Sequence, residues 1–301
     1  MKKNLFLLGL MVSSMTMVAQ TEVKKESWYF KLGGSYFVQT AATEFPTVGG
    51  KPALSKVYQG GQLVSEESVT GSFGEGFRTG VTAGYRFNTR LGVELGVNYY
   101  SSNDKTMAQT KSDMPYIPAT GVYNFKSVGQ ITAFDLAPAL VLFLGEHKGF
   151  EPYTKVGVLV PIHGDLEITT DAVAPVAPGV MAEIHSVDKV KPNPTLGFVA
   201  ALGTSYKLGK NISAFAELEY RNFTVHGKSK ETTEFTVNGA DRLSTRTTAQ
   251  IHTNYQDKID VNSNNGTTNA AGFDSSKPMD ELSSYVGISG LGLTLGLKYS
   301  L

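Results

Sequence analysis

The strongest constraint on the fold is a strict alternation of residue types at the C-terminal end, in "SGLGLTLGLKYSL". Leucine or tyrosine occupies every second position from Leu291 to Leu301, and glycine, threonine, lysine or serine occupies the positions between. Period two is the pattern of a β-strand whose faces meet different surroundings. A soluble sheet turns the leucine face inward, whereas a membrane barrel turns it outward to lipid. The rest of the sequence has to discriminate between these two folds.

Seven further segments carry the same alternation, and helix-period apolar stripes are scarce. These segments span 27–37, 76–87, 91–100, 131–145, 153–162, 195–208 and 212–223. Together with 289–301 they predict an all-β chain of eight strands. Pro138 lies inside the fourth segment, where a strand tolerates proline poorly, so we expect a bulge or a local break there.

The connections between these segments alternate in length without exception. The short ones are 88–90, 145–152 and 209–211, and the long ones are 38–76, 101–127, 163–194 and 224–284. All short turns therefore fall at one end of the structure and all long loops at the other. The sequence thus predicts an eight-stranded antiparallel up-and-down transmembrane β-barrel with long extracellular loops. A hairpin predicted around "NGAD" in the last long loop leaves ten strands open as an alternative.

The first residues and the composition limit the compartment and the partners. Lys2 and Lys3 precede the apolar stretch "LFLLGLMVSSMTMVA", which predicts a signal peptide over 1–19 and a mature barrel domain over 20–301. The chain has no cysteine, and its 27 basic residues balance 27 acidic ones. This balance gives no support to a nucleic-acid partner. No cluster with ligand spacing predicts a metal, and no cofactor is expected.

Charged residues mark the face that turns inward in a membrane barrel. They lie on the strand face opposite the continuous apolar residues, together with most of the strand glycines. The predicted lumen charge network consists of Lys31, Arg78, Arg86, Glu94, Asp135, Lys155, Glu217, Glu219, Arg221 and Lys298. Eight strands leave an interior that side chains nearly fill, and a buried charge without a partner is costly. We therefore expect a packed network of salt bridges rather than an ion path.

Aromatic residues gather at the strand ends and bound an aliphatic band. The predicted girdle at the short-turn end consists of Trp28, Phe30, Phe87, Tyr153, Tyr206 and Tyr299. The predicted girdle at the long-loop end consists of Tyr36, Phe77, Tyr99, Phe134, Tyr220 and Tyr285. Two such belts are typical of the interfaces of a bilayer. Because hydrocarbon leaves no backbone group unpaired, the last strand must pair with the first and close the barrel.

The strand count, the turn pattern and phrases such as "GVTAGYRF" and "LGVELGVNYY" resemble the small outer-membrane β-barrel families. These are the OmpA transmembrane domain and the OmpX/Ail type, and more loosely OmpW. The resemblance covers 27–301 as architecture, and no further domain is expected after the last strand. The chain ends in Leu301 rather than the phenylalanine of the usual assembly signal, with Tyr299 two residues earlier. The resemblance implies the outer membrane of a Gram-negative bacterium, with membrane lipid and lipopolysaccharide as partners.

The sequence favours a non-enzymatic surface protein, with no catalytic residue assigned. Its long loops, 38–76, 101–127, 163–194 and 224–284, would contact the environment, a host surface or envelope components. Three alternatives stay open. An OmpW-like conduit for small hydrophobic molecules would need an apolar channel with a lateral opening. A rim-active lipid-modifying enzyme would use His163 or His226 with a serine such as Ser229. A soluble secreted ligand-binding barrel is the third.

Overall fold

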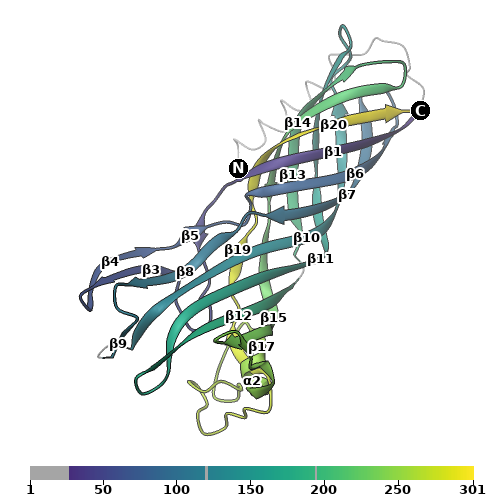
Figure 1. Cartoon of the computed structure of the whole chain (residues 1–301). Coiled ribbons are helices and arrows are strands. Elements are labelled where there is room, and N and C mark those ends of the chain that lie inside the picture. The colour runs from purple at the N-terminus through teal and green to yellow at the C-terminus, as the bar shows by residue number, and fades with distance from the viewer. Residues whose placement is uncertain (1–26, 119–120, 194) are drawn as a thin grey trace, which may run out of the picture.

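Eight strands form a closed antiparallel ring in the computed structural model, which describes residues 27–118, 121–193 and 195–301 (Figure 1). In order, they are β1 (Ser27–Gln39), β6 (Gly76–Arg86), β7 (Leu91–Ser102), β10 (Val122–Phe143), β11 (Phe150–Ala177), β13 (Gly197–Lys207), β14 (Ile212–Asn222) and β20 (Gly290–Ser300). Each pairs with the next, and β20 pairs back onto β1 with Leu297 opposite Leu32. This confirms the predicted eight-stranded barrel and its closure. The predicted signal peptide lies outside the described residues.

The four long connections contain far more sheet than the one hairpin that the sequence predicted. Strands β10 and β11, of 22 and 28 residues, run well past the ring. Beside them lie β3 (Leu54–Gln59), β4 (Gln62–Ser68), β8 (Lys105–Ser112), β12 (Val180–Asn193), β15 (Thr224–Val237), β17 (His252–Gln256) and β18 (Met279–Leu282). They pair in the order β4-β3-β8-β10-β11-β12-β15-β17-β18, which we call the outer sheet. The predicted boundaries of the fourth and fifth strands were therefore too short, because these strands continue where lipid no longer imposes a strict alternation.

Short elements complete the extension. They are β2 (Thr43–Glu44), β5 (Thr70–Gly71), β9 (Tyr116–Ile117), β16 (Ala240–Asp241), β19 (Tyr285–Gly287), a 3-10 turn at Leu243–Thr245 and the helix α2 (Thr248–Ile251). The hairpin predicted around "NGAD" is confirmed, with Val237 opposite Ala240 and positive φ angles at Asn238 and Gly239. It stands in the outer sheet, so the ring keeps eight strands. Among the described residues, no helix is long and apolar enough to cross a membrane.

The irregularity expected at Pro138 is present on the β11 side, where pairing skips two residues between Leu136 opposite Val160 and Ala139 opposite Gly157. Strand β10 continues through Pro138, which is paired with Leu95 of β7. Its register against β11 shifts between Phe134 and Asp135, three residues earlier. The strand is not broken, because a proline removes only one ladder hydrogen bond while the neighbouring pairs remain.

The two faces of the ring differ as a membrane barrel requires. Leucines on the outer face are widely exposed, with 61% for Leu32, 66% for Leu202 and 57% for Leu295. Residues between them on the same strands, such as Lys31 and Lys298, are buried inside the ring at 6% each. Charge thus faces the lumen and leucine faces outward, the reverse of a soluble barrel.

Placing a charge on the outer face should destabilise the barrel. For Leu295→Arg, near the middle of β20, we expect a loss of about 2 kcal/mol in the free energy of unfolding, because a cation meets hydrocarbon. Urea unfolding in lipid vesicles measures this loss. Leu63→Arg on β4 of the outer sheet is the control, since Leu63 is 46% exposed outside the ring. Equal losses in the two variants would contradict the outward orientation of Leu295.

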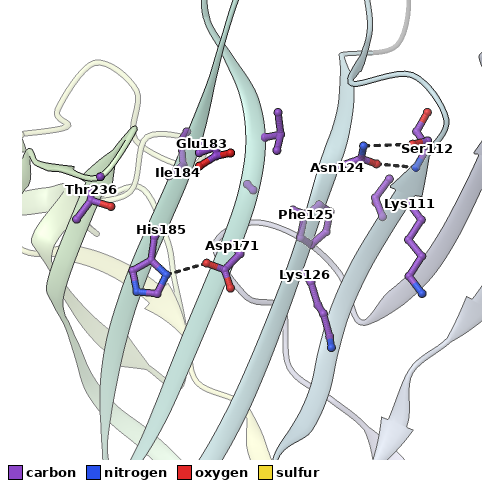
Figure 2. Close-up of a pocket in the computed structure, with 14 residues that line it drawn as sticks. Lys111, Ser112, Asn124, Phe125, Lys126, Asp171, Glu183, Ile184, His185 and Thr236 are labelled. Atoms are coloured by element: carbon purple, nitrogen blue, oxygen red, sulfur yellow. Dashed lines mark hydrogen bonds and ion pairs between the residues drawn. The ribbon is translucent and has the colours of Figure 1, made fainter.

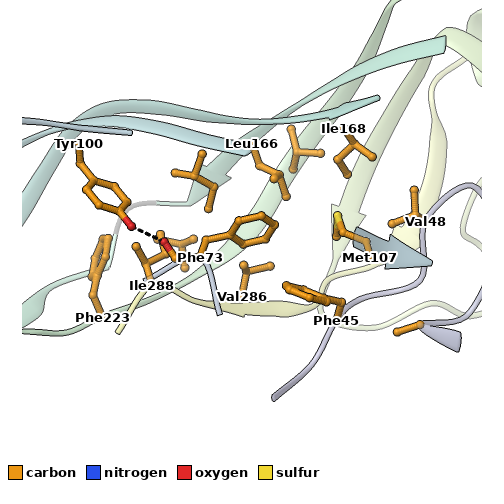
Figure 3. Close-up of a cluster of buried hydrophobic side chains, with 14 residues drawn as sticks. Phe45, Val48, Phe73, Tyr100, Met107, Leu166, Ile168, Phe223, Val286 and Ile288 are labelled. Atoms are coloured by element: carbon orange, nitrogen blue, oxygen red, sulfur yellow. Dashed lines mark hydrogen bonds between the residues drawn. The ribbon is translucent and has the colours of Figure 1, made fainter. Parts of the chain in front are cut away.

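An apolar cluster fills the interior at the outer end of the barrel (Figure 3). We call it the outer core. It consists of Phe45, Val48, Ala53, Phe73, Tyr100, Met107, Ile131, Leu166, Ile168, Val190, Phe223, Val225, Val286 and Ile288. The Tyr100 hydroxyl donates to the Phe73 carbonyl at 2.6 Å, which satisfies the one polar group of that ring. The interior is therefore charged within the ring and apolar at its outer end, and the apolar part was not predicted.

Candidate functional site: the lumen and the outer groove

Two positively charged and two negatively charged residues form the centre of the lumen. Lys31 Nζ lies 2.5 Å from Glu94 and 2.9 Å from Glu217, and Lys155 Nζ lies 2.6 Å from Glu217. The Tyr29 hydroxyl donates to Glu94 at 3.1 Å, and the Tyr153 hydroxyl donates to Glu217 at 2.7 Å. Each carboxylate thus accepts from both an ammonium group and a phenol, which offsets the cost of burying it.

Arginines dominate the outer end of the lumen. Arg78 donates to Glu219 at 2.5 Å and to Asp135 at 2.9 Å, and Asn98 donates to Asp135 at 2.8 Å. Arg221 is instead held between two aromatic faces. Its guanidinium carbon lies 4.2 Å from the Phe37 ring centre and 3.8 Å from that of Tyr100. Stacking of this kind stabilises a buried cation by attraction to the ring faces.

A third group lies at the short-turn end, around a carboxylate that the sequence reasoning missed. Glu151 accepts from Arg86 at 2.7 Å and from Lys298 at 3.3 Å. It was assigned to the turn 145–152, but β11 begins at Phe150. Its parity is that of Lys155 on the same strand, and this signal would have placed it in the lumen. All ten predicted lumen charges also lie inside the ring, and all but Lys155 are buried.

Glycines on the lumen face make room for aromatic rings. A Cβ at Gly84 would lie 2.2 Å from the Tyr29 ring, and one at Gly203 would lie 2.6 Å from the Tyr153 ring. A Cβ at Gly292 would lie 2.6 Å from the Phe37 ring. The lumen cavity lined by Lys31, Arg78 and Glu217 measures only about 50 Å³. Among the described residues, side chains therefore fill most of the lumen at this level.

Most of the predicted girdle residues point outward. Eleven of the twelve are exposed: Trp28, Phe30, Tyr36, Phe77, Phe87, Tyr99, Phe134, Tyr206, Tyr220, Tyr285 and Tyr299. The twelfth assignment was wrong, because Tyr153 is 2% exposed and lies in the lumen. It shares the parity of Lys155 and Gly157, so its ring must point inward with theirs. That the outward residues meet the bilayer interfaces stays a prediction.

The outer sheet carries a polar groove of about 590 Å³ (Figure 2). It crosses β8, β10, β11 and β12 and reaches the turn after β15. Lys111 and Lys126 lie on its β8 and β10 side, and Asp171 and Glu183 lie on its β11 and β12 side. His185 Nδ1 is 2.7 Å from Asp171 Oδ1. The Thr236 hydroxyl lies on the same sheet face as His185 and Asp171, whereas Phe125 is paired with Thr110 and Ala172 on the opposite face.

The histidines considered for catalysis lie at the outer rim. His226 Nδ1 is 3.2 Å from Ser283 Oγ, and that hydroxyl also donates to the Gly227 carbonyl at 3.1 Å. Ser229, the serine suggested by the sequence, is paired in the sheet with Asn254 and Lys191. Within the described part of the chain, no group of three or more His, Cys, Asp or Glu residues is arranged to hold a metal ion.

Comparison with known families decides the class of this barrel. Residues 5–256 match the family model described as "Outer membrane protein beta-barrel domain". The chain belongs to this family. It is accordingly an integral β-barrel protein of the outer membrane of a Gram-negative bacterium, and the soluble-barrel alternative is excluded. No curated protein matches the sequence.

Eighteen chains of solved structures also match. Neisserial surface protein A is 10% identical, with 92% of this chain and 99% of that chain covered and a TM-score of 0.37. OprG of Pseudomonas aeruginosa is 13% identical, with 91% and 96% covered and a TM-score of 0.41. Ail of Yersinia pestis, crystallised with the heparin analogue sucrose octasulfate, is 11% identical, with 93% and 100% covered and a TM-score of 0.29.

Proposed function

We propose that this family member is a non-enzymatic surface-binding protein, whose packed barrel anchors the outer sheet and whose polar groove binds an acidic oligosaccharide. One observation carries the proposal. The largest concave polar surface described above is outside the ring, whereas the lumen is filled by ion pairs. A chain that uses its barrel only as an anchor has its recognition surface in the extension.

The groove residues match the chemistry of an acidic sugar chain. Lys111 and Lys126 would face a carboxylate or sulfate, and Asp171 and Glu183 would accept hydrogen bonds from sugar hydroxyls. A volume of about 590 Å³ accommodates a ligand of several rings. Both charge signs are thus present, so the lysines can pair with the acidic groups of the ligand while the carboxylates accept hydrogen bonds from its hydroxyls.

Reversing the groove charge should weaken glycan binding. For Lys111→Glu combined with Lys126→Glu, we expect at least a tenfold lower affinity for an acidic oligosaccharide, because attraction becomes repulsion. Surface plasmon resonance on the detergent-folded full chain, with heparin-derived and neutral oligosaccharides as probes, measures the change. Lys258→Glu combined with Lys277→Glu is the control, since both lysines are exposed and pair with local aspartates away from the groove.

The experiment distinguishes an error in the location of the site from an error in the class of ligand. Binding that is unchanged in the groove variant, or lost equally in the control, would overturn the assignment of the groove. Absence of binding to any acidic probe would overturn the ligand class. We do not propose passage through the lumen, because the ion pairs and aromatic rings occupy it. We also do not propose catalysis at His226, because the Ser283 hydroxyl donates to a backbone carbonyl.

A further inference from the structure

The outer extension carries an apolar cavity of about 540 Å³, which parts of the chain that are distant in sequence surround. Its floor belongs to the outer core and consists of Leu166, Ile168, Val190 and Val286 (Figure 3). Its walls come from the first long connection, within 46–50, and from the last, within 255–284. Thr47, Thr268 and Leu282 in these walls are exposed, so the cavity opens to the surrounding medium.

Glu281 is the one charged side chain among the described residues that line this cavity. It is half-buried, and within the described part of the chain its carboxylate forms no ion pair and accepts no side-chain hydrogen bond. The preceding residue, Asp280, instead accepts from the Asn264 N–H at 2.7 Å. A carboxylate above an apolar floor is costly without a partner, so this position favours a cation as its neighbour.

Two lysines that flank the walls in sequence are held outside the cavity. Lys51 Nζ lies over the Tyr123 ring, 4.6 Å from its centre, and Lys258 Nζ lies 3.2 Å from Asp260. None of these four residues lines the cavity. The cavity therefore keeps the negative charge of Glu281.

Tyr255 lies beside Glu281, because the two residues are paired in the parallel ladder of β17 and β18. Paired residues project from the same face of a sheet, and both line the cavity. A Cβ at Gly227 would lie 2.7 Å from the Tyr255 ring, so this glycine leaves room for the ring. Burial, and then the charges of Glu281 and Asp188, raise the pKa of Tyr255 well above its usual range. The phenol is therefore neutral at physiological pH, and its ring face can attract a cation.

The walls are held in place by hydrogen bonds of the protein itself. Asn265 Oδ1 accepts from the backbone N–H groups of Thr267 at 2.9 Å and Thr268 at 3.1 Å, and its Nδ2 donates to the Asp280 carbonyl at 2.9 Å. In the opposite wall, Val48 and Lys51 exchange two backbone hydrogen bonds of 2.9 and 2.8 Å. A ligand would therefore enter a largely preformed site, which lowers the cost of ordering it.

We propose that this cavity binds an organic cation, a protonated amine with an aromatic body, with the ammonium group between Glu281 and the Tyr255 ring and the body on the apolar floor. The carboxylate disfavours anions, and the apolar floor disfavours hydrated inorganic cations. A volume of about 540 Å³ accommodates a molecule of two or three rings. The cavity shares no lining residue with the polar groove, so this inference is independent of the glycan proposal.

The experiment uses the full chain in lipid nanodiscs, with empty nanodiscs as the reference for partitioning into lipid. Equilibrium dialysis, read by naphthalene fluorescence, measures the binding of naphthylmethylamine and of naphthylmethanol, which has the same rings without a charge. We expect at least tenfold tighter binding of the amine at neutral pH. Glu281→Gln, which keeps the shape of the side chain, should lower the affinity for the amine to that for the alcohol.

A second variant tests the cavity itself. Ser284 lines the cavity, so Ser284→Trp should occupy it and lower the binding of both probes at least tenfold. Glu234→Gln and Ser244→Trp are the matched controls, since both positions are exposed and neither lines the cavity. Both controls should bind the amine as the unmodified chain does. Heat-dependent gel mobility verifies that each variant is folded.

Three results would overturn the proposal. They are equal binding of the two probes by the unmodified chain, an unchanged preference for the amine in folded Glu281→Gln, and losses in the controls that equal those in the variants. The variant with reversed charge at Lys111 and Lys126 should keep its affinity for the amine, so failure of the glycan proposal and failure of this one are distinguishable.

Discussion

Replacing Glu217 with alanine is expected to lower the free energy of unfolding by about 3–5 kcal/mol, because it breaks a buried ion-pair network. Glu217 accepts from Lys31 at 2.9 Å, from Tyr153 at 2.7 Å and from Lys155 at 2.6 Å. Its loss leaves two ammonium groups in the lumen with one nearby carboxylate fewer. Urea unfolding in lipid vesicles, followed by the fluorescence of the single tryptophan, Trp28, measures the change.

The matched control for Glu217→Ala is a surface pair. Glu66 lies 2.7 Å from Lys56 on the outer sheet, and its side chain is 44% exposed. Removal of an exposed partner costs about 0–1 kcal/mol, because water screens the pair. If Glu217→Ala lost no more than Glu66→Ala, the lumen charges would not stabilise the barrel.

Replacing Gly296 with valine should disrupt the seam that closes the ring. Gly296 faces Gly33 of β1, and a Cβ there would lie 2.2 Å from the Leu32 carbonyl oxygen and 2.6 Å from the Phe215 ring. A backbone oxygen cannot move aside as a side chain can. We expect a loss of about 3 kcal/mol in the free energy of unfolding, at the upper end of overpacking costs.

The readout for Gly296→Val is the folded fraction after refolding into vesicles. A folded barrel changes its gel mobility on heating, and an unfolded chain does not. Gly209→Val is the control, because Gly209 lies in a short turn with no heavy atom within 4 Å of its ideal Cβ position. Similar folded fractions for the two variants would show that the β1–β20 seam tolerates a side chain at Gly296.

Most of the ring was predictable because each of its strands alternates between residues suited to lipid and residues suited to the lumen. Leu291 to Leu301 alternate with glycine, threonine and lysine, and this local pattern gives the strand and its two faces without knowledge of any neighbour. The order of short and long connections then gives the antiparallel topology. Tyr153 was assigned to the girdle because it lies near a strand end, although the alternation along β11 places it on the lumen face. Glu151 was missed because β11 begins at Phe150, earlier than expected.

Pairing across distant strands was not predictable in the same way. Which carboxylate meets Lys31 depends on the register around the ring, and Glu217 comes from a strand on the far side of β20. No local pattern encodes that stagger, since it follows from how eight strands close on each other. The sequence could therefore name ten lumen charges without saying which of them touch.

By itself, then, the sequence determined the membrane barrel, because lipid imposes a period-two pattern that each strand must satisfy alone. The tertiary structure decided how the chain is arranged outside the bilayer. Beyond the bilayer, strands β10 and β11 pair with segments whose alternation is weak, and their apolar residues gather from distant connections into the outer core. The groove arises there, because it depends on which strands pair with each other rather than on the residues of any one strand.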